Sequence, residues 1–154
     1  MKKSPPQKKN LKKVLIASDH AGFDLKKFLI NELEKLQFEV LDLGCDSATK
    51  SVDYPDFAQK LCKKITEKNQ ISGILICGSG IGISIAANRF KNIRAALCHN
   101  AKSAKLTRAH NDANVLCLGA RVVKNKSALS IAKAFFSTEF EGARHAARVA
   151  KLSK

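Results

Sequence analysis

The sequence predicts an α/β fold: a single three-layer Rossmann-like domain with a five-stranded parallel sheet and helices on both faces. Short continuous apolar runs recur along the chain, as expected for strands buried on both faces. Segments with the apolar spacing of amphipathic helices separate these runs. The length of 154 residues fits one domain. Because such alternation closes right-handed crossovers, we expect the strand order 2-1-3-4-5.

The first strand is expected at 14–17, where an apolar Val-Leu-Ile-Ala run ends in the polar turn 18–22. Residues 23–37 then place their apolar side chains on one broad helical face, with lysines and acids opposite. A second short strand follows at about 38–43. These four segments form the first strand–helix–strand unit.

A helix is expected over 55–69, because Pro55 suits a first helical turn. The next buried strand covers 71–77 and runs into a glycine-rich turn, 78–82, followed by a helix to about Arg89. The remaining strands are expected at 94–98 and 114–118, and the remaining helices at 101–109, 126–137 and 141–152. Ligands of such sheets bind at the carboxyl ends of the strands, so the residues after each strand are the site candidates.

The formal net charge is +15, and six lysines lie within the first 13 residues. We interpret residues 1–11 as a flexible basic arm and 12–154 as the folded domain. Such a charge run is usually a solvated tail, so nucleic acid is an unlikely partner by composition. No apolar run approaches the roughly 20 residues that span a bilayer, and no signal peptide is visible. We therefore expect a cytoplasmic protein with no membrane partner.

The five cysteines are widely and unequally spaced, without a C-x-x-C pair, which indicates free thiols. Four of them are interpreted as buried structural residues. Cys77 differs because it directly precedes Gly78-Ser79-Gly80-Ile81-Gly82, a turn whose amides can converge on an anion or oxyanion. A thiolate is favoured beside such a helix start, so Cys77 is a candidate base or nucleophile.

Other polar residues follow the predicted elements. Asp19 and His20 come directly after the first strand. His110 lies where a helix gives way to a loop, with Asn111 and Asp112 as candidate orienting partners. Arg144 and Arg148 share one helix face, which suits phosphate recognition, although this motif alone favours a solvated helix face.

Several of these motifs, in order and at matching spacing, resemble ribose-5-phosphate isomerase type B, whose wider family includes galactose-6-phosphate and allose-6-phosphate isomerases. The resemblance extends from about Lys12 to Leu152. The runs that carry it are Ser18–Phe23, Asp53–Pro55, Ile76–Asn88, His110–Val115 and Glu141–His145.

The resemblance implies roles for individual residues. Cys77 is implied as the base that moves a proton between adjacent sugar carbons, with Ser79 beside it. His110 is implied to open the sugar ring, and Asp19 to act on the ring oxygens. Asn111 is implied to contact the sugar or its enediolate. The implied enediolate-binding positions are Gly78, Gly80, Ile81 and Gly82, and the implied phosphate anchors are His20, Arg121, Arg144 and Arg148.

The implied activity is the interconversion of ribose 5-phosphate and ribulose 5-phosphate in the pentose phosphate pathway, without a cofactor or metal. The implied assembly is a homodimer or homotetramer with its sites at the subunit boundary and the C-terminal helix in subunit contacts. Three alternatives stay open. They are an isomerase of six-carbon sugar phosphates (allose 6-phosphate or galactose 6-phosphate), a thiol redox enzyme that uses Cys77, and a basic polyanion-binding protein.

Overall fold

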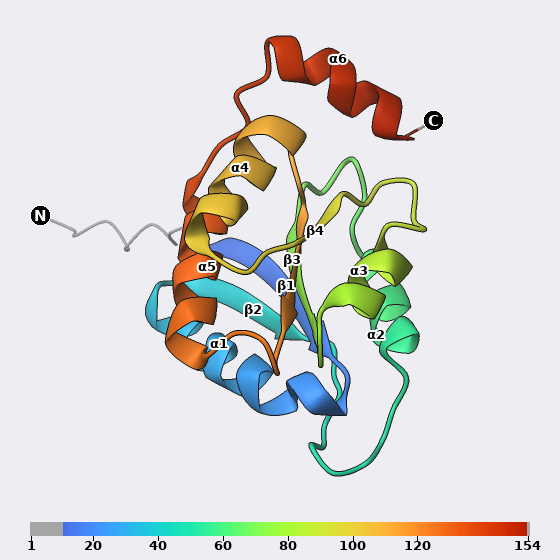
Figure 1. The fold of residues 1–154 in the computed structure, drawn as a ribbon, viewed down its shortest axis with the longest axis vertical. Coiled ribbons are helices and arrows are strands. Elements are labelled where there is room, and N and C mark those ends of the chain that lie inside the picture. The colour runs from blue at the N-terminus through green and yellow to red at the C-terminus, as the bar shows by residue number, and fades with distance from the viewer. Residues whose placement is uncertain (1–10, 154) are drawn as a thin grey trace, which may run out of the picture.

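In the computed structural model, which describes residues 11–153, five strands form one sheet in the order β2-β1-β3-β5-β4 (Figure 1). All four neighbouring pairs are parallel. The fold class is therefore confirmed. The strands are β1 (Lys12–Ser18), β2 (Phe38–Asp42), β3 (Ser72–Cys77), β4 (Ala95–Leu97) and β5 (Val115–Gly119).

The order of the last two strands differs from the expected 2-1-3-4-5, because β5 lies between β3 and β4. Burial gives the physical reason. All five residues of β5 are buried, whereas the three residues of β4 are only half-buried. The longer apolar strand gains more from a central place, where both of its faces are covered, and the short strand leaves few unpaired backbone groups at the edge.

Helices cover both faces of the sheet (Figure 1). The helices α1 (Phe23–Lys35), α4 (Ala101–Asn111) and α5 (Asn125–Ser137) pack on one face, and α2 (Tyr54–Cys62) and α3 (Ile81–Ala87) on the other. The remaining elements are the 3₁₀ turns η1 (His20–Gly22) and η2 (Lys151–Ser153) and the helix α6 (Arg144–Ala150). Figure 1 shows α6 standing apart at one end of the molecule.

Side chains of β1 alternate between two separate cores. Val14 and Ile16 belong to the core beneath α1, α4 and α5, whereas Leu15 and Ala17 belong to the core beneath α2 and α3. Successive side chains of a strand point to opposite faces, so a strand buried on both faces needs a continuous apolar run. This explains why the run was visible in the sequence.

Helix α2 ends at Cys62, seven residues before the expected end at residue 69. In the segment after Cys62, polar side chains form hydrogen bonds with the backbone in place of helical hydrogen bonds. The Asn69 side chain accepts from the backbone N–H of Thr66, and the Thr66 hydroxyl accepts from that of Asn69. Local bonds of this kind compete with helical ones, which apolar periodicity alone does not reveal.

Residues 1–10 of the predicted basic arm lie outside the described residues, and the described Leu11 is exposed. Between residues 11 and 153, no helix is both long and apolar enough to cross a membrane.

Lys26 of α1 is completely buried, and Asp42 at the end of β2 neutralises it. The ammonium donates to both carboxylate oxygens of Asp42, at 2.7 and 2.6 Å. The same carboxylate accepts from the backbone N–H of Gly44 at 2.9 Å. This pair therefore ties α1 to the start of the loop that leads from β2 to α2.

Asp42→Asn should lower the free energy of unfolding by about 3 kcal/mol, because it leaves a buried ammonium without its counter-charge. Urea denaturation measures this loss. Glu32→Gln is the matched control. Glu32 lies in the same helix as Lys26 and pairs with Lys35 at the surface, so this variant should lower the free energy of unfolding by less than about 1 kcal/mol. Equal losses for the two variants would contradict the role given to Asp42.

Candidate active site

Cys77 is the last residue of β3 and lies at the carboxyl edge of the sheet, between the ends of β1 and β5. Ser18 is in register with Ile76, and Cys77 with Gly119. The residues that follow β1 and β5 therefore flank Cys77. We call this set the carboxyl-edge group: Asp19, His20, Cys77, Gly78, Ser79, Gly80, Ile81, Gly82 and Arg121.

The Cys77 thiol is 4% exposed and faces the loop that follows it. The backbone N–H of Gly80 donates to Cys77 Sγ at 3.1 Å. An amide that donates to sulfur stabilises negative charge on it. The neighbouring Ser79 is exposed, and its hydroxyl accepts from the backbone N–H of Ile81 at 3.2 Å. A buried thiol and an exposed hydroxyl therefore lie two residues apart at the start of this loop.

Close neighbours explain two of the loop's glycines. Gly80 has a φ of +77°, and a Cβ there would lie 2.5 Å from Leu97 Cδ1. A Cβ at Gly78 would lie 2.9 Å from a guanidinium nitrogen of Arg121. Arg121 is held in place because its backbone N–H donates to the Gly78 carbonyl at 3.0 Å. The loop and the Arg121 side chain therefore pack directly on each other. The sequence did not predict this contact.

Asp19 and His20 follow β1, as expected. Asp19 is buried, and its carboxylate accepts from the backbone N–H of Gly22 at 3.2 Å, which caps the short turn η1. His20 Nδ1 accepts from the backbone N–H of Val52 at 3.2 Å. This bond fixes the tautomer, so Nε2 carries the proton and is a donor for a ligand.

Tyr54 is a neighbour of the loop for which the sequence suggested no role. A Cβ at Gly82 would lie 2.5 Å from the Tyr54 ring, so the ring of this α2 residue packs against the start of α3. The run Asp53–Pro55 was the only sequence signal, and the contact itself depends on how α2 packs on α3.

The other cysteines match the expectation of buried structural thiols. Burial raises the pKa of Cys62 to about 12 and raises the pKa of Cys98 and Cys117 as well. Cys45 donates to the Ser47 carbonyl at 3.3 Å. All five cysteines are free thiols in the structure.

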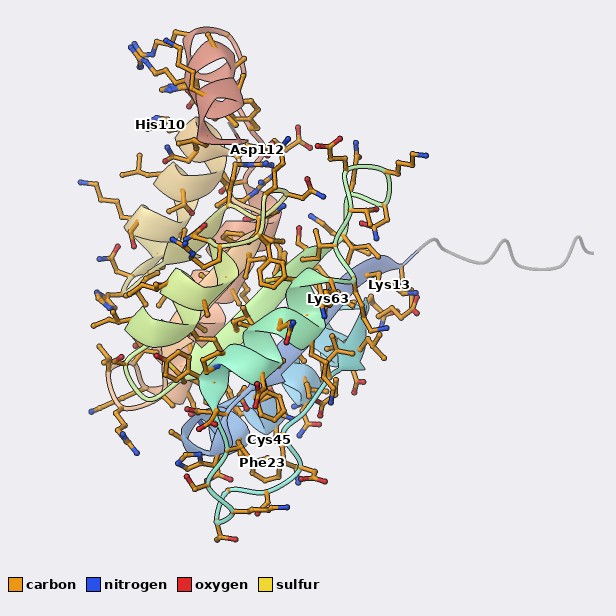
Figure 2. The ribbon with its side chains drawn as sticks, turned by 90° about the vertical axis from the view of Figure 1, so that its right-hand side faces the viewer. Lys13, Phe23, Cys45, Lys63, His110 and Asp112 are labelled. Carbon is orange, nitrogen blue, oxygen red and sulfur yellow. The ribbon has the colours of Figure 1, made fainter. Side chains whose placement is uncertain are left out.

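The remaining predicted residues lie at the opposite edge of the sheet. Helix α4 starts at its cap Asn100, beyond the carboxyl end of β4, and returns to the amino end of β5. Its 11 residues span about 16 Å. Figure 2 shows His110 and Asp112 at one end of the molecule and Phe23 and Cys45, near the carboxyl edge, at the other. We call this second set the amino-edge group: His110, Asn111, Arg144 and Arg148.

One chain therefore does not bring the two groups together. The segment before α6 assembles the amino-edge group, because the backbone N–H of Glu141 donates to the Ala109 carbonyl at 3.0 Å. The rings of His110 and His145 stack with centroids 4.4 Å apart and an interplanar angle of 15°. His145 is buried, whereas Arg144 and Arg148 are exposed.

The side chains of His110, Glu141 and His145 bring three candidate metal-ligand atoms within 4.8 Å of one another. One contact disfavours a metal ion at this position. The Arg144 guanidinium donates to His145 Nε2 at 3.4 Å, which occupies the lone pair that a metal would need.

Asp112 is not the orienting partner of His110 that the sequence suggested. Its carboxylate pairs instead with Arg94 at 3.1 Å and with Arg108 at 2.9 Å. The carboxylate nearest to His110 belongs to Glu141, at 4.0 Å from His110 Nε2. Arg108 has the i, i+4 spacing of a helical ion pair with Asp112, whereas Arg94 could not be predicted from spacing because it lies outside the helix.

The environment of His145 predicts a pH dependence of stability. Burial, His110 and Arg144 lower the pKa of His145, whereas Glu141 opposes them and Arg148 adds to them. The unfolded chain then binds more protons than the folded one at mildly acidic pH. Stability should fall as pH drops below the ordinary histidine value of about 6.5.

Urea denaturation at pH 7.5 and pH 5.5 tests this. His145→Gln should reduce the loss of stability between the two pH values, whereas His99→Gln, at an exposed histidine before α4, should leave it unchanged. The same loss in wild type and His145→Gln would contradict the prediction.

Comparisons with known proteins identify the family of this chain. The sequence profile of a family described as ribose/galactose isomerase matches residues 14–152. Ribose-5-phosphate isomerase B of Escherichia coli (strain K12) is 42% identical over 143 residues, which cover 93% of this chain and 95% of that protein.

Two solved structures superpose closely on the chain. Ribose 5-phosphate isomerase B from Anaplasma phagocytophilum is 51% identical, with a TM-score of 0.87, over 92% of this chain and 97% of that one. Ribose-5-phosphate isomerase B from Mycoplasma genitalium, solved with bound ribulose-5-phosphate, is 42% identical, with a TM-score of 0.88, over 92% and 93%.

Proposed function

This chain belongs to the ribose/galactose isomerase family, and we propose that it interconverts ribose 5-phosphate and ribulose 5-phosphate through an enediolate. It is an aldose–ketose isomerase. The main observation that supports this site is the position of Cys77. It is the last residue of β3, and its sulfur accepts a hydrogen bond from the backbone N–H of Gly80 in the loop that follows.

In this proposal Cys77, as the thiolate, removes the proton from C2 of the open-chain aldose. The electron pair moves into the C1–C2 bond, and negative charge builds up on O1, where the amides of residues 78–82 stabilise it. Cys77 then returns the proton to C1, while O1 gains a proton and the C2 hydroxyl loses one. The sequence of steps is reversible and gives the ketose. Ser79 lies beside the base on the same loop.

The other predicted residues complete the reaction. Ribose 5-phosphate must open its ring before C2 can be deprotonated, and we assign this step to His110, with Asp19 acting on the ring oxygens. Asn111 contacts the sugar or its enediolate. The phosphate is held by the proposed anchors His20, Arg121, Arg144 and Arg148. Anchoring the phosphate away from the reacting carbons provides binding energy for positioning.

Two chains are needed to form one such site, because the proposed ring-opening residue and base lie at opposite edges of one sheet. We therefore propose a homodimer in which the amino-edge group of one chain covers the carboxyl-edge group of its partner; a tetramer would pair two such dimers. Exposed apolar side chains around the glycine loop support this. Ile81, Ile85 and Val122 are 53%, 61% and 55% exposed. Such a patch marks an interaction surface.

The isolated position of α6 supports the same arrangement, since this helix carries two of the proposed phosphate anchors (Figure 1). We further propose that residues 12–154 contain the whole isomerase unit, so that removing residues 1–11 leaves the activity unchanged. Because a sugar phosphate is charged and does not cross a bilayer unaided, we expect the enzyme in the cytoplasm with its substrate.

A coupled assay of ketose formation tests the proposed function. We expect turnover of ribose 5-phosphate, at a higher kcat/KM than for allose 6-phosphate or galactose 6-phosphate, and equal rates with a metal chelator present. Faster turnover of a six-carbon substrate would replace the proposed one. If no sugar phosphate turned over, while the chain bound a polyanion with a steep salt dependence, the basic-binder alternative would replace the enzyme.

A further inference from the structure

A carboxylate between two arginines closes the last turn of α4. Asp112 follows the helix in the left-handed conformation, with φ 46° and ψ 45°. Its oxygens accept from Arg94 Nη2 at 3.1 Å and from Arg108 Nη1 at 2.9 Å. Arg94 precedes β4 and Arg108 lies in α4, so the carboxylate joins the residue before β4 to the last turns of the helix that follows it.

Both arginines also bind the backbone around Asp112. Arg94 Nε donates to the Asp112 carbonyl at 2.7 Å, and Arg108 Nη1 donates to the Ala113 carbonyl at 2.6 Å. Arg108 Nε reaches the Thr138 carbonyl at 3.3 Å, at the end of α5. Thr138 begins the segment that leads to Glu141 and α6. The network therefore fixes the end of α4 against β4 and against the start of the segment that carries the proposed phosphate anchors.

We propose that Asp112 is a positioning residue for the isomerisation, acting through His110. His110 lies two residues before Asp112, and the Asp112 side chain does not bind it. Asp112 fixes instead the backbone from which His110 projects. Among residues 11–153 the His110 side chain makes no hydrogen bond, and Glu141 approaches its Nε2 only to 4.0 Å, so the backbone and the stacked ring of His145 set its position. This inference rests on the proposed role of His110.

Asp112→Asn is the sharpest variant. Asparagine adopts the left-handed conformation as readily as aspartate, so the turn itself is retained. The amide carries one acceptor oxygen and one donor nitrogen. Its nitrogen must then face the donors of one arginine, which opens that half of the network. Ring-opening geometry is sensitive to such a displacement, so we expect kcat for ribose 5-phosphate to fall by about tenfold to a hundredfold.

A double-mutant cycle separates positioning from general structural damage. In the background of His110→Asn, Asp112→Asn should lower kcat no further, because the residue it positions is already gone. KM should change less than kcat, since the variant removes no proposed anchor and Arg108 keeps its bond to the Thr138 carbonyl. Leu33→Val, in the core beneath α1, is the control for a loss of stability without a link to His110; it should leave kcat unchanged. If Asp112→Asn does not fold, Arg94→Gln removes one arm of the same network and takes its place.

The outcomes are distinguishable. An unchanged kcat in Asp112→Asn, with His110→Asn impaired, overturns the positioning role and leaves the proposed function intact. Independent, multiplicative losses in the double variant also overturn it. Wild-type activity in His110→Asn removes the assigned ring-opening residue and this inference with it. Absence of isomerase activity in the wild-type protein itself overturns the proposed function.

Discussion

Cys77→Ala is expected to lower kcat for ribose 5-phosphate by about a hundredfold to ten-thousandfold, the range typical of a lost general base. The variant keeps the glycine loop and the proposed phosphate anchors, so KM should change far less than kcat. Cys77→Ser, which retains the shape of the side chain but offers a far weaker base, should be similarly impaired. Solvent exchange of the C1 hydrogen of ribulose 5-phosphate in D₂O should be lost in both variants, because this exchange needs the base but no ring opening.

Cys62→Ala is the matched control. Cys62 is the buried last residue of α2, and burial raises its pKa to about 12, which keeps it a neutral thiol. Its replacement should retain the wild-type kcat. Wild-type kcat in a folded Cys77→Ala variant would show that another group is the base, and equal losses in the two variants would point to damaged packing instead.

Two inactive chains are expected to form an active pair when each supplies what the other lacks. In the proposed dimer, one chain contributes Cys77 to a site and its partner contributes His110. A heterodimer of Cys77→Ala with His110→Asn then contains one doubly damaged site and one intact site. It should have about half of the wild-type activity, because each of two symmetric sites works independently. Differently tagged chains, co-expressed and purified in two affinity steps, allow this measurement.

The reciprocal pairing provides the control. A wild-type chain combined with a Cys77→Ala/His110→Asn chain leaves one lesion in each shared site, so this heterodimer should be inactive. If each site belonged to one chain, the two results would be exchanged: the first pair would be inactive and the second half-active. A monomeric protein with full activity would equally contradict the shared site.

The fold class followed from local pattern. Strands buried on both faces and one-sided helices leave distinct apolar spacings in the sequence, and the parallel sheet follows from their alternation. The order of β4 and β5 did not follow, because it depends on which strand buries more surface in the assembled sheet. The predicted end of α2 was wrong for a related reason. Thr66 and Asn69 form side chain–backbone hydrogen bonds with each other, and the spacing of apolar residues does not predict such bonds.

The sequence by itself determined that Cys77, Asp19 and Arg121 share one edge, because parallel strands end together and the residues after them are read directly from the chain. Only the tertiary structure decided that Arg121 packs on Gly78, that Asp112 pairs with Arg94, and that His110 stacks on His145. These contacts join residues from separate elements, and packing alone brings such residues together. The structure also placed His110 across the sheet from Cys77, since a helix that follows a parallel strand must return to the opposite edge before the next strand can begin.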